Sequence, residues 1–152
     1  MRIDVALAGI SRLEVDTAPF IYFAEQDLKF RDRVREVFRF AEENKITLVT
    51  STVTLTEVLV KPLRTGDKSV EGTYRALLSD TKFVQLIPVD EAIANRAAHL
   101  RATYNLRTPD ALQAATAIES GAGAFLTNDL GVKRVTEIRV LVLDELEIDP
   151  TP

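Results

Sequence analysis

Four acidic residues could act together because of where each falls in the expected fold. They are Asp16, Glu57, Asp110 and Asp129. Asp16 and Asp129 each follow a stretch that is typical of a buried strand. Asp110 falls in the first turn of a helix, and Glu57 lies on a helix that follows another buried strand. Ligands of open α/β sheets bind at the carboxyl ends of the strands, so we expect all four carboxylates to reach that edge.

Such a cluster of carboxylates is suited to one kind of chemistry. Several carboxylates close together repel one another and cannot all stay ionised unless a cation joins them. Mg²⁺ or Mn²⁺ takes oxygen ligands of this kind, lowers the pKa of a bound water and stabilises charge on a scissile phosphate. The chain has no cysteine and only one histidine, which excludes thiolate and multi-histidine metal sites. The cluster therefore predicts a metal-dependent phosphodiesterase.

Each of the four acids also has a simpler interpretation, as a residue that caps or stabilises a helix. Asp16 and Asp129 each precede an expected helix, and Asp110 would complement a helix dipole. Thr54 and Glu57 have the spacing of a capping box, although they fall inside an expected helix. Caps gather at this edge of a parallel sheet by topology, so proximity alone does not separate the two interpretations.

Strands and helices alternate along the chain, which predicts a three-layer α/β/α domain with a mainly parallel central sheet. The expected strands cover residues 11–15, 46–50, 83–89, 124–127 and 139–143. The expected helices cover residues 17–23, 28–44, 52–63, 69–79, 91–104, 108–120 and 130–135. The helix from residue 108 is rich in alanine, and small residues of this kind let a helix lie close to a sheet.

The length of 152 residues and a hydrophobic content of 46% suit one folded domain. We expect that domain over residues 1–144, followed by an acidic, flexible tail over residues 145–152. No apolar run is long enough to cross a bilayer and no secretory leader is apparent, so we expect a cytoplasmic protein without a membrane partner. The net charge is −4, but setting the four acids aside leaves equal numbers of acidic and basic residues. Net charge therefore neither supports nor excludes an RNA partner.

Four stretches of the chain resemble the PIN-domain family, and in particular its VapC-type ribonuclease toxins. They are LEVDTAPFIY (13–22), STVTLTEV (51–58), PDALQAA (109–115) and FLTND (125–129). They occur in the family's order and span nearly the whole chain. The resemblance implies that the four acids are the catalytic residues and the ligands of Mg²⁺ or Mn²⁺. It also implies that Thr17, and Thr127 or Asn128, are polar neighbours that orient ligands or water.

The resemblance further implies cleavage of single-stranded RNA, homodimerisation and inhibition by a cognate antitoxin protein. One alternative is a PIN-like binding or regulatory module that has lost catalysis, although all four acids are present. An aspartyl-phosphate enzyme would need a second acid two residues after Asp16, and this position is Ala18. A receiver-like domain would need an acidic pair before its first helix, and the chain has none there.

Basic residues near the expected edge are candidates for binding the RNA backbone. They are Lys61, Arg64, Lys68, Lys133 and Arg134. Groups of this kind beside a metal site would position a strand without reading its sequence. The alternative for all of them is ordinary solubilising charge. His99 is interpreted as a surface or core histidine in preference to a general base.

Overall fold

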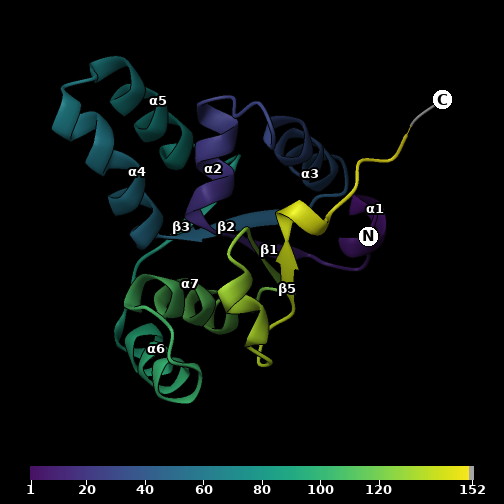
Figure 1. Ribbon diagram of the computed structural model, residues 1–152, viewed down its shortest axis with the longest axis vertical. Helices are drawn as coiled ribbons and strands as arrows, with labels where there is room; N and C mark the ends of the chain where they lie inside the picture. The colour runs from purple at the N-terminus through teal and green to yellow at the C-terminus, as the bar shows by residue number, and fades with distance from the viewer. Residues whose placement is uncertain (151–152) are drawn as a thin grey trace.

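The computed structural model, which describes residues 1–150, has three layers, with a five-stranded sheet between two layers of helices (Figure 1). The strands are β1 (Arg12–Val15), β2 (Thr47–Ser51), β3 (Val84–Ile87), β4 (Ala124–Thr127) and β5 (Val140–Val142). Their order in the sheet is β3-β2-β1-β4-β5, and every neighbouring pair is parallel. This arrangement confirms the predicted α/β/α class and places β1 at the centre.

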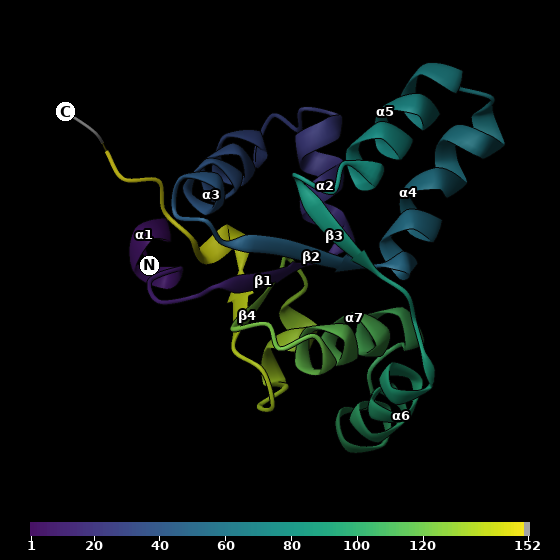
Figure 2. The same ribbon diagram turned by 180° about the vertical axis from the view of Figure 1, so that it is seen from behind.

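Helices cover both faces of the sheet, as Figure 2 shows from behind. One face carries α2 (Thr17–Ala24), α3 (Arg31–Glu43), α4 (Thr52–Thr65) and α5 (Lys68–Ser79). The other face carries α7 (Thr108–Glu119), with α6 (Glu91–Tyr104) packed on its outer side. Three short helices complete the described fold: α1 (Ile3–Ala6), η1 (Leu130–Arg134) and η2 (Leu143–Glu145). None of the helices within residues 1–150 is both long and apolar enough to span a bilayer.

The two faces of the sheet bury two hydrophobic clusters, because side chains alternate along each strand. Leu13 and Val15 of β1 join the cluster beneath α2 and α3. Phe125 of β4 joins the cluster on the α7 side. Four alanines of α7 that are fully buried also belong to that cluster: Ala111, Ala114, Ala115 and Ala117. Their small side chains let the helix lie close to the sheet, as predicted.

For helix α3, the sequence pattern predicts the buried face correctly but the first residue wrongly. Its buried residues are Val34, Val37, Phe38 and Ala41, as their helical spacing predicts. The helix begins at Arg31, whereas we expected residue 28. The Asp27 carboxylate accepts the backbone N–H groups of Lys29 (3.0 Å) and Phe30 (2.9 Å), and these bonds hold a turn before the helix.

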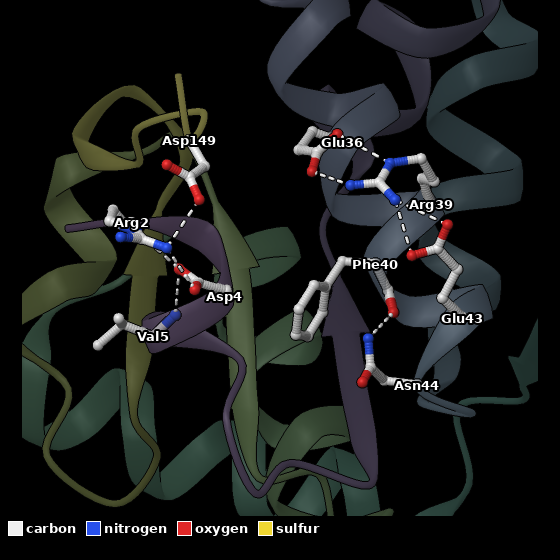
Figure 3. Close-up of polar contacts among 9 residues, drawn as sticks. All are labelled: Arg2, Asp4, Val5, Glu36, Arg39, Phe40, Glu43, Asn44 and Asp149. Carbon is white, nitrogen blue, oxygen red and sulfur yellow. Dashed lines mark hydrogen bonds and ion pairs between the residues drawn. The ribbon is translucent and has the colours of Figure 1, made fainter. Parts of the chain in front are cut away.

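The start of the expected flexible tail lies against the amino-terminal segment. The Ile3 N–H donates to the Glu147 carbonyl (3.1 Å), and the Glu147 N–H donates to the Met1 carbonyl (2.8 Å). Figure 3 shows the Arg2 guanidinium between the carboxylates of Asp4 and Asp149, at 2.7 and 2.8 Å. Contacts therefore hold the tail up to residue 149, and residues 151–152 lie outside the described part of the chain.

A glutamate lies where β1 is most deeply buried. Glu14 is fully buried, and its neighbours in the sheet are Val49 of β2 and Phe125 of β4. Neither carboxylate oxygen has a hydrogen-bond partner among the described residues. Burial, and then the negative charge of Asp16, raise the pKa of Glu14 well above its ordinary value, whereas Arg12 opposes the shift. An ionised Glu14 therefore destabilises the folded state.

We expect Glu14→Gln to stabilise the protein increasingly as the pH rises. Glu14 ordinarily titrates near 4.5, and its pKa is higher in the folded state, so its contribution to stability is greatest below pH 4.5 and falls as the pH rises. At high pH, each tenfold difference in the proton affinity of Glu14 between the folded and unfolded states lowers the free energy of unfolding by about 1.4 kcal/mol. Urea unfolding from about pH 4 to pH 8 measures the difference in unfolding free energy between variant and wild type.

The exposed Glu42 provides the control, because Glu42→Gln should give a difference that changes little with pH. A difference for Glu14→Gln that stays flat across the same range would contradict the burial argument.

Candidate active site

The ends of β1 and β4 lie side by side and bring two of the predicted acids to one edge. Val15 of β1 pairs with Leu126 of β4, and the Asp16 N–H donates to the Leu126 carbonyl (2.9 Å). Asp16 directly follows β1, and Asp129 follows the end of β4 by two residues. Both acids therefore stand at the carboxyl edge of the sheet, as predicted.

Thr127 joins these two acids directly. Its hydroxyl donates to Oδ2 of Asp16 (2.7 Å) and accepts the backbone N–H of Asp129 (3.0 Å). Thr127 is fully buried at the end of β4, so the hydroxyl has a fixed position. The sequence left Thr127 and Asn128 as alternative neighbours of the acids, and the structure places Thr127 between them. Asn128 instead binds the Tyr22 hydroxyl (3.3 Å) and the Asp144 N–H (3.0 Å).

Both aspartates are also helix caps, as the simpler interpretation predicts. Oδ1 of Asp16 accepts the Thr17 N–H (2.7 Å) at the start of α2, and Oδ1 of Asp129 accepts the Gly131 N–H (2.8 Å) at the start of η1. Each of these caps uses one carboxylate oxygen. Capping therefore fixes the two carboxylates in place and leaves them able to take part in a site.

Glu57 reaches the site through Thr17. The Thr17 hydroxyl donates to Oε1 of Glu57 (2.6 Å), which joins the start of α2 to the second turn of α4. The capping-box interpretation of Thr54 and Glu57 is wrong. Helix α4 begins one residue after Ser51, whose hydroxyl accepts the Val53 N–H (3.0 Å), and the Thr54 hydroxyl is buried beneath the site.

A chain of buried hydroxyl and amide groups lies beneath these acids, and the sequence analysis did not identify it. Nε2 of Gln113, on α7, donates to the hydroxyls of Thr54 (2.8 Å) and Thr17 (3.3 Å). Thr54 in turn binds the Thr50 hydroxyl (2.7 Å), which donates to the Val15 carbonyl (2.7 Å). The network joins α2, α4 and α7 to the sheet, so the position of Thr17 depends on three elements.

Arg107 is the second contributor that the sequence analysis did not identify. It directly precedes α7, and its Nε donates to Oδ2 of Asp110 (3.0 Å). Its Nη2 lies 4.0 Å from Oδ2 of Asp129. The guanidinium thus joins the remaining acid, Asp110, to the others. Its spacing of three residues before Asp110 was the available signal, since it allows an ion pair across the first turn of a helix.

The four acids therefore belong to one connected cluster, and the charges of Asp110 and Glu57 act on Asp16. The pKa of Asp16 is raised from 3.8 to about 6. Burial is the main cause, and the charges of Asp110 and Glu57 add to it, while the bonds from Thr127 and Thr17 oppose it. The surroundings of Asp16 thus oppose its ionisation.

The cluster supplies the ligands of a hard cation without forming a finished coordination shell. Within residues 1–150, no three acidic or histidine side chains lie close enough in their present positions to share one metal ion. The donors are nevertheless all carboxylate oxygens, which suit Mg²⁺ or Mn²⁺. A positive group, the Arg107 guanidinium, already lies against two of them. The residues present therefore have the donor chemistry that a divalent cation needs.

The predicted basic residues divide into two groups. Lys133 binds Glu145 (2.7 Å) and Arg134 donates to the Tyr104 carbonyl (3.0 Å), so both have partners within the chain. Lys61 lies on α4 and lines a groove with Glu57. Arg64 and Lys68 are exposed where α4 turns into α5.

His99 is exposed on α6, a helix that packs on α7.

Comparison with known proteins identifies the family. The sequence profile of the PIN domain matches residues 13–138, a span that contains all four acids. The chain belongs to the PIN-domain family. No match was found among curated protein sequences.

Solved structures share the fold of this PIN domain at low sequence identity. VapBC2 of Rickettsia felis, bound to a promoter DNA fragment, has a TM-score of 0.72 and 18% identity, over 86% of this chain and 98% of that chain. FitAcB of Neisseria gonorrhoeae has a TM-score of 0.68 and 18% identity, over 88% and 99%. VapC20 of Mycobacterium tuberculosis, a toxin that cleaves the sarcin-ricin loop, has a TM-score of 0.62 and 16% identity, over 84% and 98%. At these identities the likeness shows the fold.

We expect Asp16→Asn to stabilise the metal-free PIN domain at neutral pH. The pKa of Asp16 is about 6 when folded and ordinarily 3.8, so ionisation of Asp16 destabilises the fold progressively as the pH rises through this range. Asparagine removes that effect and can still cap α2, so the gain above pH 6 should be between about 1 and 3 kcal/mol. Urea unfolding in a chelator measures it, and a gain that is equally large at about pH 4 would argue against this cause.

We expect Thr17→Val to destabilise the domain by about 1–3 kcal/mol, because it leaves buried partners without a hydrogen bond. Valine has the shape of threonine but can neither donate to Glu57 nor accept from Gln113. Thr73→Val is the matched control, because the Thr73 hydroxyl is exposed and binds only its own helix, at the Ser69 carbonyl (3.0 Å). Similar losses for the two variants in urea unfolding would disprove a special role for the network.

Proposed function

We propose that this PIN domain is a metal-dependent endoribonuclease that cleaves single-stranded RNA. The observation that supports this best is the joining of four carboxylates, distant in sequence, into one cluster at the carboxyl edge of the sheet. Thr17, Thr127 and Arg107 make the connections. Caps alone would not need to be joined in this way.

The proposed roles follow from the position of each residue. Asp16, Glu57, Asp110 and Asp129 would hold Mg²⁺ or Mn²⁺, which supplies a hydrolytic water of lowered pKa and offsets charge on the phosphate. Thr127 and Thr17 would keep the carboxylates of Asp16 and Glu57 in place. Burial is the main cause of the raised pKa of Asp16, and the charges of Asp110 and Glu57 add to it. A divalent ion would offset these two charges, so their repulsion favours cation binding.

Lys61, Arg64 and Lys68 are the proposed contacts with the RNA backbone. Lys61 lies one turn after Glu57 on α4, and the other two follow at the α4–α5 turn. None of the three has an ion pair with another described residue. Lys133 and Arg134 remain weaker candidates, because both have partners within the chain.

We further propose that the protein is the toxin of a toxin–antitoxin pair, as a cytoplasmic homodimer inhibited by a cognate antitoxin. The support is the set of solved structures with this fold, which includes VapBC complexes and VapC20, a toxin that cleaves the sarcin-ricin loop. A catalytically inactive binding module is the second candidate. The presence of all four acids argues against it, and calorimetry that detects no divalent-ion binding would favour it.

We expect the purified protein to cleave RNA only when Mg²⁺ or Mn²⁺ is present. We expect Asp16→Asn or Asp110→Asn to lower the cleavage rate at least about 100-fold, because each substitution removes a charged metal ligand. Sequencing the ends of total RNA after expression locates the cuts. Asp90→Asn is the matched control, because Asp90 caps α6 through the Ile93 N–H (2.9 Å) and asparagine is an equally good cap. Cleavage that survives both Asp16→Asn and Asp110→Asn would disprove the proposal.

A further inference from the structure

The position of Arg107 raises a question that the proposed metal site does not answer. Its guanidinium lies against Oδ2 of Asp110 (3.0 Å) and near Oδ2 of Asp129 (4.0 Å), so it contacts oxygens that the proposed metal would need. Among the described residues, it is the basic side chain that forms ion pairs with two of the four acids. A positive group in this place must either move or compete when a divalent cation binds.

The backbone of Arg107 is held firmly, although its side chain is exposed. The carbonyl of Arg107 accepts the Ala111 N–H (3.0 Å), which begins α7. The preceding residue, Leu106, is buried, and its carbonyl accepts Nε of Arg101 (2.9 Å). The Arg107 side chain is 78% exposed, whereas that of Asp110 is 14% exposed. Arg107 is therefore a long, exposed cation attached at a fixed point beside a partly buried carboxylate.

Competition between Arg107 and a divalent cation follows from their shared partners. Carboxylates that are paired with a guanidinium hold a metal ion less tightly, because the ion must displace the pair and two positive groups then lie close together. The coupling between the two equilibria is reciprocal. If Arg107 weakens metal binding, metal binding equally weakens the ion pairs of Arg107 with Asp110 and Asp129. The released side chain would remain at the edge of the site, because hydrogen bonds hold its backbone at the start of α7.

The chemistry of the guanidinium matches the proposed substrate. Its planar fork of N–H donors binds phosphate oxygens in pairs, which a lysine ammonium does not do. Lys133 and Arg134, the basic residues that follow Asp129, have partners within the chain. Arg107 thus lies beside the acids, and its present partners are the same carboxylates that the metal would bind.

We propose that Arg107 occupies the carboxylates in the metal-free protein and, once a divalent cation binds them, turns to hold a phosphate of the RNA backbone. This proposal depends on the proposed metal site. The two claims nevertheless make separate predictions, because removing Arg107 should strengthen metal binding and weaken RNA binding, whereas removing an acid should weaken metal binding.

The test measures binding and not cleavage. Calorimetry with Mn²⁺ alone should show that Arg107→Gln binds the ion about five- to tenfold more tightly than wild type, since a competing charge is gone. Arg107→Lys keeps the charge and should stay near wild type. Arg96→Gln is the matched control, because Arg96 pairs with Glu119 (2.8 Å) at the opposite end of α7, and it should leave Mn²⁺ affinity unchanged.

The second measurement uses a 2′-O-methylated single-stranded oligonucleotide in saturating Mn²⁺, and gel electrophoresis checks that the oligonucleotide stays intact during the titration. Arg107→Gln should bind it about tenfold more weakly, and the slope of log affinity against log salt should fall by about 0.7, as for the loss of one phosphate contact. Arg107→Lys should bind it less tightly than wild type, because lysine lacks the planar fork.

The outcomes separate the two claims. If Asp16→Asn loses Mn²⁺ binding but Arg107→Gln binds both Mn²⁺ and the oligonucleotide as wild type does, the role of Arg107 is overturned and the metal site stands. Tighter Mn²⁺ binding without weaker oligonucleotide binding overturns the phosphate contact. A wild-type protein that binds no Mn²⁺ overturns both claims.

Discussion

Repulsion among carboxylates at one edge of the sheet is the constraint to which the rest of the structure responds. The pairing of β1 with β4 places Asp16 and Asp129 on neighbouring strand ends, and α4 and α7 bring Glu57 and Asp110 to them. The fold tolerates these charges through hydroxyl donors, helix-start N–H groups and one guanidinium. Each of these partners offsets part of the charge, and none of them neutralises the whole cluster. The residual repulsion is what a divalent cation would relieve.

The same strand carries a second ionisable group that lowers stability. Glu14 lies within β1, two residues before Asp16, without a hydrogen-bond partner among the described residues. A strand at the centre of a parallel sheet is ordinarily apolar on both faces. Glu14 within this strand and Asp16 at its end therefore weaken the centre of the fold when they are ionised.

Much of this organisation could be predicted from the sequence, for physical reasons that also explain what was missed. Periodicity identified the buried face of α3, and strand–helix alternation placed Asp16 and Asp129 at one edge, because both depend on local pattern. The role of Gln113 could not be seen, since its partners Thr54 and Thr17 lie far from it in sequence. Arg107 was overlooked because a single arginine before a helix resembles any other solvent-facing cation.

The sheet order has a consequence for the newly made polypeptide on the ribosome. β4 is the fourth strand to be synthesised, yet it inserts between β1, the first, and β5, the last. The chain therefore cannot close its centre until β4 has emerged, and Asp129 follows 113 residues after Asp16. A truncated or stalled product would lack both the central pairing and the final acid. Translation itself thus delays assembly of the acidic cluster until nearly the whole polypeptide has been made.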